Sequence, residues 1–192
     1  MVGLKARLAS ANAHKLAELA AALPGWELEL LGAAEFPPED GETYYENALG
    51  KARFGRATGD HAAWMLGEDA GIEVDGLGGE PGVRSARWAD GDQAVALLER
   101  LGAVDGDGRR ARMVTELVGI APGGAELRGT GVLEGRIAKD KRGAGGFGYD
   151  PVFVPDGETR TVAELGDDWK RANSHRARAA RALVKAIRAS TG

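Results

Sequence analysis

The sequence predicts an α/β protein in which helices cover a β-sheet. Residues 2–9 alternate apolar and polar side chains, as expected of a strand with one buried face. Leu16, Leu19 and Leu23 then recur at helical spacing. The apolar run 62–66, which is followed by Gly67, has the length of a buried strand. Strands that alternate with helices along the chain are typical of the α/β class.

The composition is that of a globular protein and excludes several kinds of site. A chain of 192 residues predicts one domain, residues 1–192, that is long enough for a substantial core with room for two lobes. The chain has no cysteine, which excludes disulfides, thiolate metal sites and cysteine nucleophiles. Lys5 and Arg7 interrupt the only candidate for a signal-peptide core, so we expect a soluble, cytoplasmic protein. The net charge of −4 argues against general nucleic-acid binding but permits a small anionic substrate.

The turn between the first strand and the first helix has the composition of an anion site. It reads Ser10-Ala11-Asn12 and stands where a helix N-terminus presents backbone amides and a positive dipole end. Lys15, in the first helical turn, can reach the same anion. The alternative is that Asn12 is an ordinary N-cap and Lys15 is solvated.

A second helix is predicted after a second strand at 26–31 and a proline-rich acidic loop at 36–42. Thr43 and Glu46 are three residues apart and form a capping box. The helix that this box begins buries Tyr45, Ala48, Leu49 and Ala52.

Lys51 is a second candidate for contact with an anion. It is four residues beyond Asn47, so the two side chains share a helix face. Lys51 lies near a helix start and could serve the same anion as Lys15, whereas an exposed lysine without function is the alternative.

Two adjacent carboxylates, Glu68 and Asp69, follow the buried strand 62–66 and are expected at its end. The end of a strand is the usual place for a site in an open α/β fold. Because like charges repel, a partner cation is expected, and Mg²⁺ suits such oxygen ligands. Glycines in the segment 76–82 would let the backbone approach a ligand closely. An acidic strand end followed by a flexible loop is the alternative.

The middle of the chain predicts structural elements. Asp90 or Asp92 caps a helix that continues to Leu101. The segments 111–121 and 125–133 form a hairpin around a Pro-Gly-Gly turn.

The segment 143–148 matches G-x-G-x-x-G but lacks the context of a dinucleotide-binding site. That fingerprint requires a helix to follow it, whereas Pro151 and the run 152–154 predict a strand. The segment therefore predicts a glycine loop that presents Phe147 and Asp150, with a planar ligand stacked on the ring. A tight turn with a core phenylalanine is the alternative.

The C-terminal segment predicts a core-packing helix with an unusual start. His175 and Arg176 stand at the end where the helix dipole favours anions, which indicates a functional reason for these cations. The helix buries Ala177, Ala180, Leu183, Val184 and Ile187.

Four stretches match one known family in order. They are Ser10-x-Asn12-x-x-Lys15; Glu46-Asn47-Ala48-x-x-Lys51-Ala52-Arg53; Asp69-x-Gly71-x-x-Val74 with Gly78-Gly79-x-Pro81-Gly82-x-x-Ser85-Ala86-Arg87; and Gly146-Phe147-Gly148-Tyr149-Asp150-Pro151 with Ser174-His175-Arg176. Over nearly its whole length the chain thus resembles the inosine/xanthosine triphosphate pyrophosphatases, house-cleaning enzymes that hydrolyse deaminated purine nucleoside triphosphates.

The resemblance implies a fold, an activity and a cofactor. The fold is an elongated mixed β-sheet flanked by helices, in two lobes with the active site in the cleft between them. The activity is Mg²⁺-dependent hydrolysis of ITP, dITP and XTP to the nucleoside monophosphate and pyrophosphate, which removes these compounds from the nucleotide pool. The family is typically homodimeric.

The resemblance also assigns roles to individual residues. Asp69 is similar to the general base and a metal ligand, and Glu39 and Glu68 to further metal contacts. The substrate contacts that it implies are Ser10, Asn12, Lys15 and Lys51 at the triphosphate, Ala70, and Phe147, Gly148, Tyr149, Asp150, Lys170, His175 and Arg176 around the nucleoside. The family usually has Asp-Asp-Ser-Gly where this chain has Glu68-Asp69-Ala70-Gly71, so the chain lacks one hydroxyl and carries a longer carboxylate.

The polarity of Arg176 and His175 suits the bases of this family. Arg176 has only donors and His175 can donate, so both match the 6-keto oxygen of hypoxanthine and xanthine and oppose the 6-amino group of adenine.

Two other functional classes are weaker. A nucleotide-binding sensor without turnover is suggested by Glu68 and Ala70, but the retained Asp69 argues against it. A metal-dependent nuclease is disfavoured by the acidic net charge and the lack of a basic stripe.

Overall fold

The computed structural model describes residues 3–33 and 35–190, so Val2, which the sequence places in the first strand, lies outside the described residues. The helices are α1 (Ala13–Ala22), α2 (Tyr44–Thr58), α3 (Gln93–Leu101), α4 (Val162–Asn173) and α5 (His175–Ser190). The strands are β1 (Leu4–Leu8), β2 (Trp26–Leu30), β3 (Trp64–Val74), β4 (Pro81–Gly82), β5 (Arg110–Ile120), β6 (Glu126–Ile137) and β7 (Phe153–Pro155).

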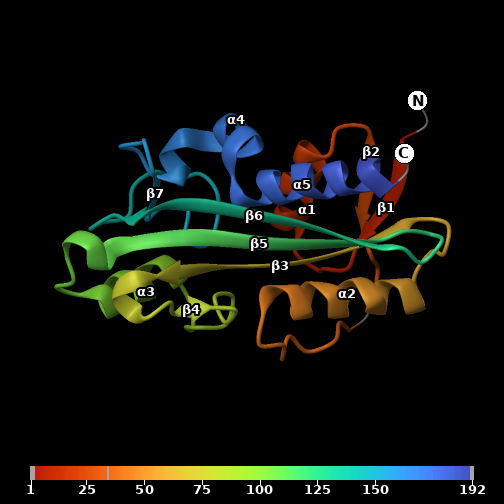
Figure 1. Cartoon of the computed structure of the whole chain (residues 1–192). Coiled ribbons are helices and arrows are strands. Elements are labelled where there is room, and N and C mark those ends of the chain that lie inside the picture. The colour runs from red at the N-terminus through yellow and green to blue at the C-terminus, as the bar shows by residue number, and fades with distance from the viewer. Residues whose placement is uncertain (1–2, 34, 191–192) are drawn as a thin grey trace. The chain divides into compact units, whose positions relative to one another are not determined.

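The strands of the described residues form one seven-stranded mixed sheet with helices around it (Figure 1). Its order is β2-β1-β3-β5-β6-β7, with β4 paired to β3. β1 runs parallel to β2 and β3, whereas β4 is antiparallel to β3 and β7 to β6. The predicted mixed α/β sheet and the predicted hairpin of β5 and β6 are confirmed.

The chain forms two compact units. The first comprises Met1–Asp69, Thr115–Gly131 and His175–Gly192, and the second comprises Ala70–Val114 and Val132–Ser174. β3, β5 and β6 each have residues in both units.

In the first unit, helices cover both faces of its part of the sheet. Neighbouring residues of a strand point to opposite faces, so β3 contacts helices on each side. Leu66 packs with Leu8 in a core cluster that α1 and α5 complete. Met65, one residue earlier on β3, packs in a second cluster with Ala48 and Ala52 of α2. Both faces are therefore buried, which explains why β3 is apolar on each side.

The second unit has a single core. Its largest fully buried side chains are Phe153, Ile72, Leu97, Leu101 and Ile137. They come from α3 and from three strands, β3, β6 and β7, so this core joins α3 to the sheet.

β3 is longer than the sequence predicts. The prediction that a strand ends before Glu68 and Asp69 was wrong, because β3 continues to Val74 and both carboxylates lie within it. Ile72 and Val74 are fully buried and continue the strand's inward-facing pattern. Gly67 explains how the strand passes α2 closely, since a Cβ there would lie 2.0 Å from the main-chain oxygen of Ala48.

α4 was not predicted from the sequence, although its start carries a clear signal. Thr161 is the N-cap, and its side chain and that of Glu164 form a capping box. The same Thr-x-x-Glu pattern identified α2 at Thr43 and Glu46, and that capping box is confirmed. Of the two candidate caps of α3, the structure selects Asp92.

Candidate active site

Asp69 lies in the first unit and is held by two side chains of α2. Its Oδ2 accepts a hydrogen bond from Asn47 Nδ2 at 3.0 Å, and its Oδ1 lies 3.5 Å from Lys51 Nζ. Asn47 and Lys51 are one helical turn apart, so they reach the same carboxylate, in agreement with the predicted shared face. Asp69 is only 3% exposed, and burial raises its pKa above the ordinary value for an aspartate, against the opposing effects of Lys51 and Asn47.

Lys51 brings three acidic residues together. Its Nζ pairs with the carboxylate of Glu39 and donates to the main-chain oxygen of Glu68 at 2.9 Å. Burial by itself lowers the pKa of this ammonium, but the surrounding carboxylates, Asp69 first, outweigh burial and raise the pKa. Lys51 therefore remains charged and partly neutralises the cluster.

Glu68 is fully buried between two cations. Its Oε2 lies 2.6 Å from Lys15 Nζ, and its Oε1 accepts a hydrogen bond from Arg176 Nε at 2.9 Å. Burial would raise the pKa of this carboxyl, but Lys15 and Arg176 outweigh burial and lower the pKa to about 2. Glu68 is thus the counter-ion of two residues that were expected to contact substrate.

These contacts explain why α5 begins with cations. Arg176 also donates to Glu18 of α1 at 3.0 Å, so two carboxylates offset its charge at the helix start. His175 is placed by Thr115 of β5, whose Oγ1 lies 2.5 Å from His175 Nδ1. Both residues are buried within the first unit.

The start of α1 is capped as one of the two sequence interpretations predicts. Asn12 is the N-cap, and its side-chain oxygen accepts hydrogen bonds from the amides of His14 and Lys15. Ser10 Oγ in turn accepts from the Asn12 amide at 3.1 Å. Contact of Ser10 and Asn12 with a triphosphate stays a prediction.

Two of the three predicted metal ligands, Glu39 and Asp69, are arranged so that they could bind a hard divalent cation together. The carboxylates of Glu39 and Asp69 converge on one point, where Lys51 Nζ now lies. Glu68 faces Lys15 and Arg176 instead, and among residues 3–33 and 35–190 no group of three His, Cys, Asp or Glu side chains is arranged as a metal site. Two carboxylates suffice for Mg²⁺ when substrate phosphates supply further oxygens.

Three of the residues expected around the nucleoside, Phe147, Asp150 and Lys170, form a second cluster in the second unit, whereas His175 and Arg176 lie in the first unit. Asp150 Oδ2 accepts from Lys170 Nζ at 2.7 Å and from the Phe147 amide at 2.9 Å. The Lys170 ammonium also lies 5.1 Å from the centroid of the Phe147 ring. The glycine loop is followed by a strand and not a helix, which agrees with the rejection of a dinucleotide fingerprint.

Tyr149 is part of the frame of this loop. Its hydroxyl bonds to the main-chain oxygen of Ser85 at 2.9 Å and lies 3.2 Å from Gln93 Oε1. Burial raises the pKa of the phenol, which keeps it protonated. Gly148 has a φ of +60°, a conformation that favours glycine. Ala70, the other predicted substrate contact of this unit, lies on β3 as the first residue of the second unit.

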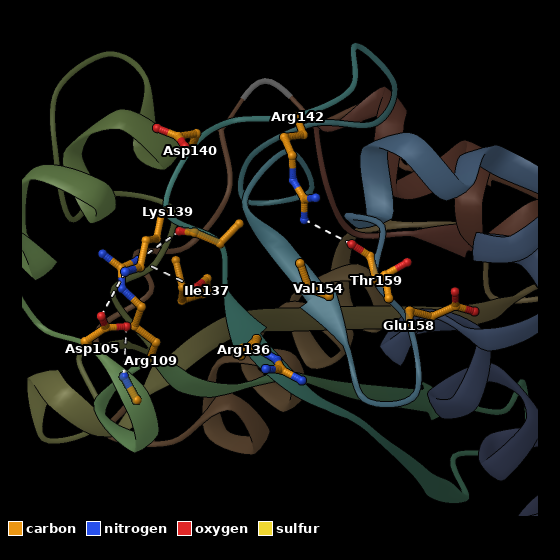
Figure 2. Close-up of a pocket in the computed structure, with 12 residues that line it drawn as sticks. Asp105, Arg109, Arg136, Ile137, Lys139, Asp140, Arg142, Val154, Glu158 and Thr159 are labelled. Atoms are coloured by element: carbon orange, nitrogen blue, oxygen red, sulfur yellow. Dashed lines mark hydrogen bonds and ion pairs between the residues drawn. The ribbon is translucent and has the colours of Figure 1, made fainter.

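A pocket of about 550 Å³ elsewhere in the second unit is lined by other residues (Figure 2). Lys139 pairs with Asp105 at 2.8 Å, and Arg142 donates to the main-chain oxygen of Thr159. The buried Arg109 donates to main-chain carbonyls, among them that of Ala138 at 2.8 Å. None of the residues that the sequence assigns to the site lines this pocket, so each of the two clusters above is a better candidate than the pocket.

The structure adds three residues to the first cluster that the sequence did not assign to it. Asn47 holds Asp69, Glu18 holds Arg176, and Thr115 holds His175. Asn47 was visible as the residue one turn before Lys51. Glu18 is three residues beyond Lys15, hence on the same face of α1, whereas Thr115 carries no local signal.

Glu68 is expected to give a pH-dependent part of the stability. Because its pKa falls from 4.5 to about 2 on folding, the charged carboxylate stabilises the fold fully above pH 4.5. This contribution is lost as the pH falls through about 2. We expect the unfolding free energy, measured by urea denaturation, to fall less steeply between these pH values in Glu68→Gln than in the wild type.

The matched control for Glu68 is an exposed carboxylate. Asp105→Asn removes a partner of Lys139 from an ion pair in which both side chains are about two-thirds exposed, and exposed pairs contribute little. It should leave the pH slope close to that of the wild type. If the unfolding free energy of Glu68→Gln depended on pH as steeply as that of the wild type, Glu68 would not be the source of the pH dependence.

Comparison with known proteins shows the family. The model of the Ham1 family matches residues 6–186. The chain belongs to the Ham1 family. A relative from Symbiobacterium thermophilum, named dITP/XTP pyrophosphatase, is 47% identical over 179 residues, which cover 90% of this chain and 89% of the relative. A protein of the same name from Thermus thermophilus is 44% identical over 195 residues, covering 97% and 93%.

A solved Ham1 structure has the same fold. The HAM1 protein from Coxiella burnetii superposes with a TM-score of 0.82 at 34% identity, over 97% of this chain and 99% of that one. Among the helices of the described residues, none is long and apolar enough to cross a membrane.

Proposed function

We propose that this Ham1-family protein hydrolyses the deaminated purine nucleoside triphosphates ITP, dITP and XTP to the nucleoside monophosphate and pyrophosphate. The names of its relatives support this activity. The observation that carries the proposal is the buried carboxylate of Asp69, which is held between Asn47 and Lys51. The same cluster also contains the cations Lys15 and Arg176 and the carboxylates Glu18, Glu39 and Glu68.

Asp69 is the general base in this proposal. Its carboxylate accepts a proton from a water molecule, which attacks the α-phosphorus in line with the bond to the β-phosphate oxygen. One phosphorus–oxygen bond forms, the α–β bond breaks, and pyrophosphate leaves. Burial makes Asp69 a stronger base than an exposed aspartate, because it raises the pKa of the carboxyl.

The cations of the first unit bind the triphosphate. Lys15 and Lys51 carry fixed positive charge, and phosphoryl transfer is catalysed mainly by positioning and charge neutralisation. Both ammonium groups are now paired with carboxylates, so the phosphates replace or share those partners. Ser10 and Asn12 complete the phosphate contacts at the start of α1.

Glu39 and Asp69 would hold Mg²⁺, with Glu68 as the third predicted ligand if it leaves its ion pairs. When bound, the ion supplies charge neutralisation at the phosphates. The residues of the second cluster contact the nucleoside. From the family resemblance we further propose that the protein is cytoplasmic and forms a homodimer.

The test is incubation with a nucleotide panel and Mg²⁺, followed by identification of the products. We expect pyrophosphate from ITP, dITP and XTP, with much slower reaction of ATP and GTP, and full loss of activity in EDTA. A site that forms hydrogen bonds to one purine base can prefer it over a base with mismatched donors and acceptors by ~10²–10⁵-fold in kcat/KM.

Three other outcomes would contradict the proposal. Release of single phosphate would indicate a phosphatase. Nucleotide binding without turnover, measured by calorimetry, would indicate a sensor. Activity that survives EDTA would remove the role of the metal.

A further inference from the structure

The side-chain amide of Asn47 joins two parts of the first cluster. Its Nδ2 donates to Asp69 Oδ2 at 3.0 Å, and its Oδ1 accepts from the Gly41 amide at 2.9 Å. Asn47 is only 5% exposed. The reversed amide would set its oxygen against a carboxylate and its NH₂ group against an N–H, so both partners require the same orientation.

This arrangement restricts the carboxylate of Asp69. One oxygen is committed to Asn47, while the other has a longer contact of 3.5 Å with Lys51 Nζ. A general base needs a lone pair with a defined direction toward the proton that it accepts. The bond from Asn47 sets the rotation of the carboxyl group and so fixes the directions of its remaining lone pairs.

The same amide fixes the loop before α2. A side chain at Gly41 would place its Cβ 2.7 Å from Asn47 Oδ1, so only glycine permits the close approach. The next two amides, of Glu42 and Thr43, both donate to Glu46 Oε2. Three successive backbone donors are therefore bound by side chains of α2. This anchors the loop that carries Glu39, whose carboxylate pairs with Lys51.

We propose that Asn47 is a positioning residue for hydrolysis: its amide holds Asp69 in the orientation of the base and fixes the loop of Glu39 to the same helix. The inference rests on the proposed role of Asp69. Partners that orient a reacting group in this way typically contribute 10- to 100-fold to activity.

Two substitutions separate the two bonds of Asn47. Asn47→Ala removes both, and we expect kcat for ITP to fall roughly 10- to 100-fold with KM close to the wild-type value. Asn47→Asp keeps the acceptor for the Gly41 amide but replaces the donor to Asp69 by a second carboxylate, which repels it. Its kcat should fall at least as far as that of Asn47→Ala.

The control is Thr43→Ala, which weakens the same helix start without touching Asp69. Thr43 Oγ1 accepts from the Glu46 amide as the N-cap, so its loss lowers Tm. We expect its kcat to remain near the wild-type value. Hydrogen exchange at the Gly41 amide gives a readout independent of activity, and it should accelerate in Asn47→Ala but not in Asn47→Asp.

The outcomes are distinct. If Asn47→Ala resembles Thr43→Ala in kcat, or if Asn47→Asp keeps its activity, Asn47 does not position the base. Unchanged Gly41 exchange in Asn47→Ala would overturn the anchoring of the loop. If the wild type itself releases no pyrophosphate from ITP, the proposed function fails and the role of Asn47 in hydrolysis fails with it.

Discussion

Asp69→Asn is expected to lower kcat for ITP by roughly 10²- to 10⁴-fold, the scale on which general bases act. Asparagine has nearly the same shape, and its side-chain oxygen can still accept the bond that Asn47 donates to Asp69 at 3.0 Å. What it lacks is the ability to take a proton from water. Substrate should therefore still bind, with KM changed far less than kcat. The measurement is steady-state release of pyrophosphate at saturating ITP and Mg²⁺.

Glu73→Gln is the control for Asp69→Asn, because it removes a carboxylate from the same strand. Glu73 pairs with Arg112 at 2.6 Å, outside the Asp69 cluster, and its loss should leave kcat close to the wild-type value. If Asp69→Asn kept a near-normal kcat, the base would have to be another carboxylate of the cluster, Glu39 or Glu68.

Arg176→Ala is expected to destabilise the fold by roughly 3–5 kcal/mol, the usual cost of removing one partner from a buried ion pair. The side chains of Arg176 and Glu68 are 7% and 0% exposed, and Glu18, the second partner, is 15% exposed. The substitution leaves Glu68 with Lys15 alone and deprives Glu18 of the same guanidinium. For a chain of this length the change corresponds to a fall in Tm on the order of 10 °C.

Two further variants identify the cause of the Arg176 effect. Arg53→Ala removes an arginine whose Nε and Nη2 both donate to the carboxylate of Glu126, but whose side chain is 61% exposed. It should cost about 1 kcal/mol or less. Adding Glu68→Gln to Arg176→Ala should cost less than the sum of the two single losses, because both substitutions remove the same Arg176–Glu68 ion pair. If Arg176→Ala were no more damaging than Arg53→Ala, the buried network would not stabilise the fold.

The variant Arg176→Ala also tests whether Arg176 recognises the purine base of the substrate. If the guanidinium recognises a 6-keto oxygen, kcat/KM should fall more for ITP than for ATP, and the preference between them should narrow. If kcat/KM fell by the same factor for ITP and ATP, Arg176 would have no role in base recognition and would only bind Glu68 and Glu18.

Local pattern was sufficient for most elements and for noticing the two adjacent carboxylates, Glu68 and Asp69. Alternation predicted β1, helical spacing predicted α1, and the capping box at Thr43 predicted the start of α2. These signals involve residues less than two helical turns apart, so they do not depend on the rest of the fold. The shared face of Asn47 and Lys51 followed from the same periodicity.

Local pattern failed where burial reversed the usual meaning of a residue. Two adjacent carboxylates suggested the end of a strand, because charged residues are usually exposed. Glu68 and Asp69 instead lie inside β3, where cations and an amide from other elements satisfy them. α4 was not predicted, although the capping box of Thr161 and Glu164 is a local signal of its start.

By itself, the sequence determined that this is an α/β protein with two adjacent carboxylates, Glu68 and Asp69, and a glycine loop with Phe147 and Asp150. It also predicted that Lys15 and Lys51 contact phosphate. Only the tertiary structure decided which charges meet. Arg176 and Glu68 are 108 residues apart in the chain, and no periodicity links them. Their pairing follows from the packing of α5 and α1 on the sheet, because a charge buried by that packing is stable only beside a partner.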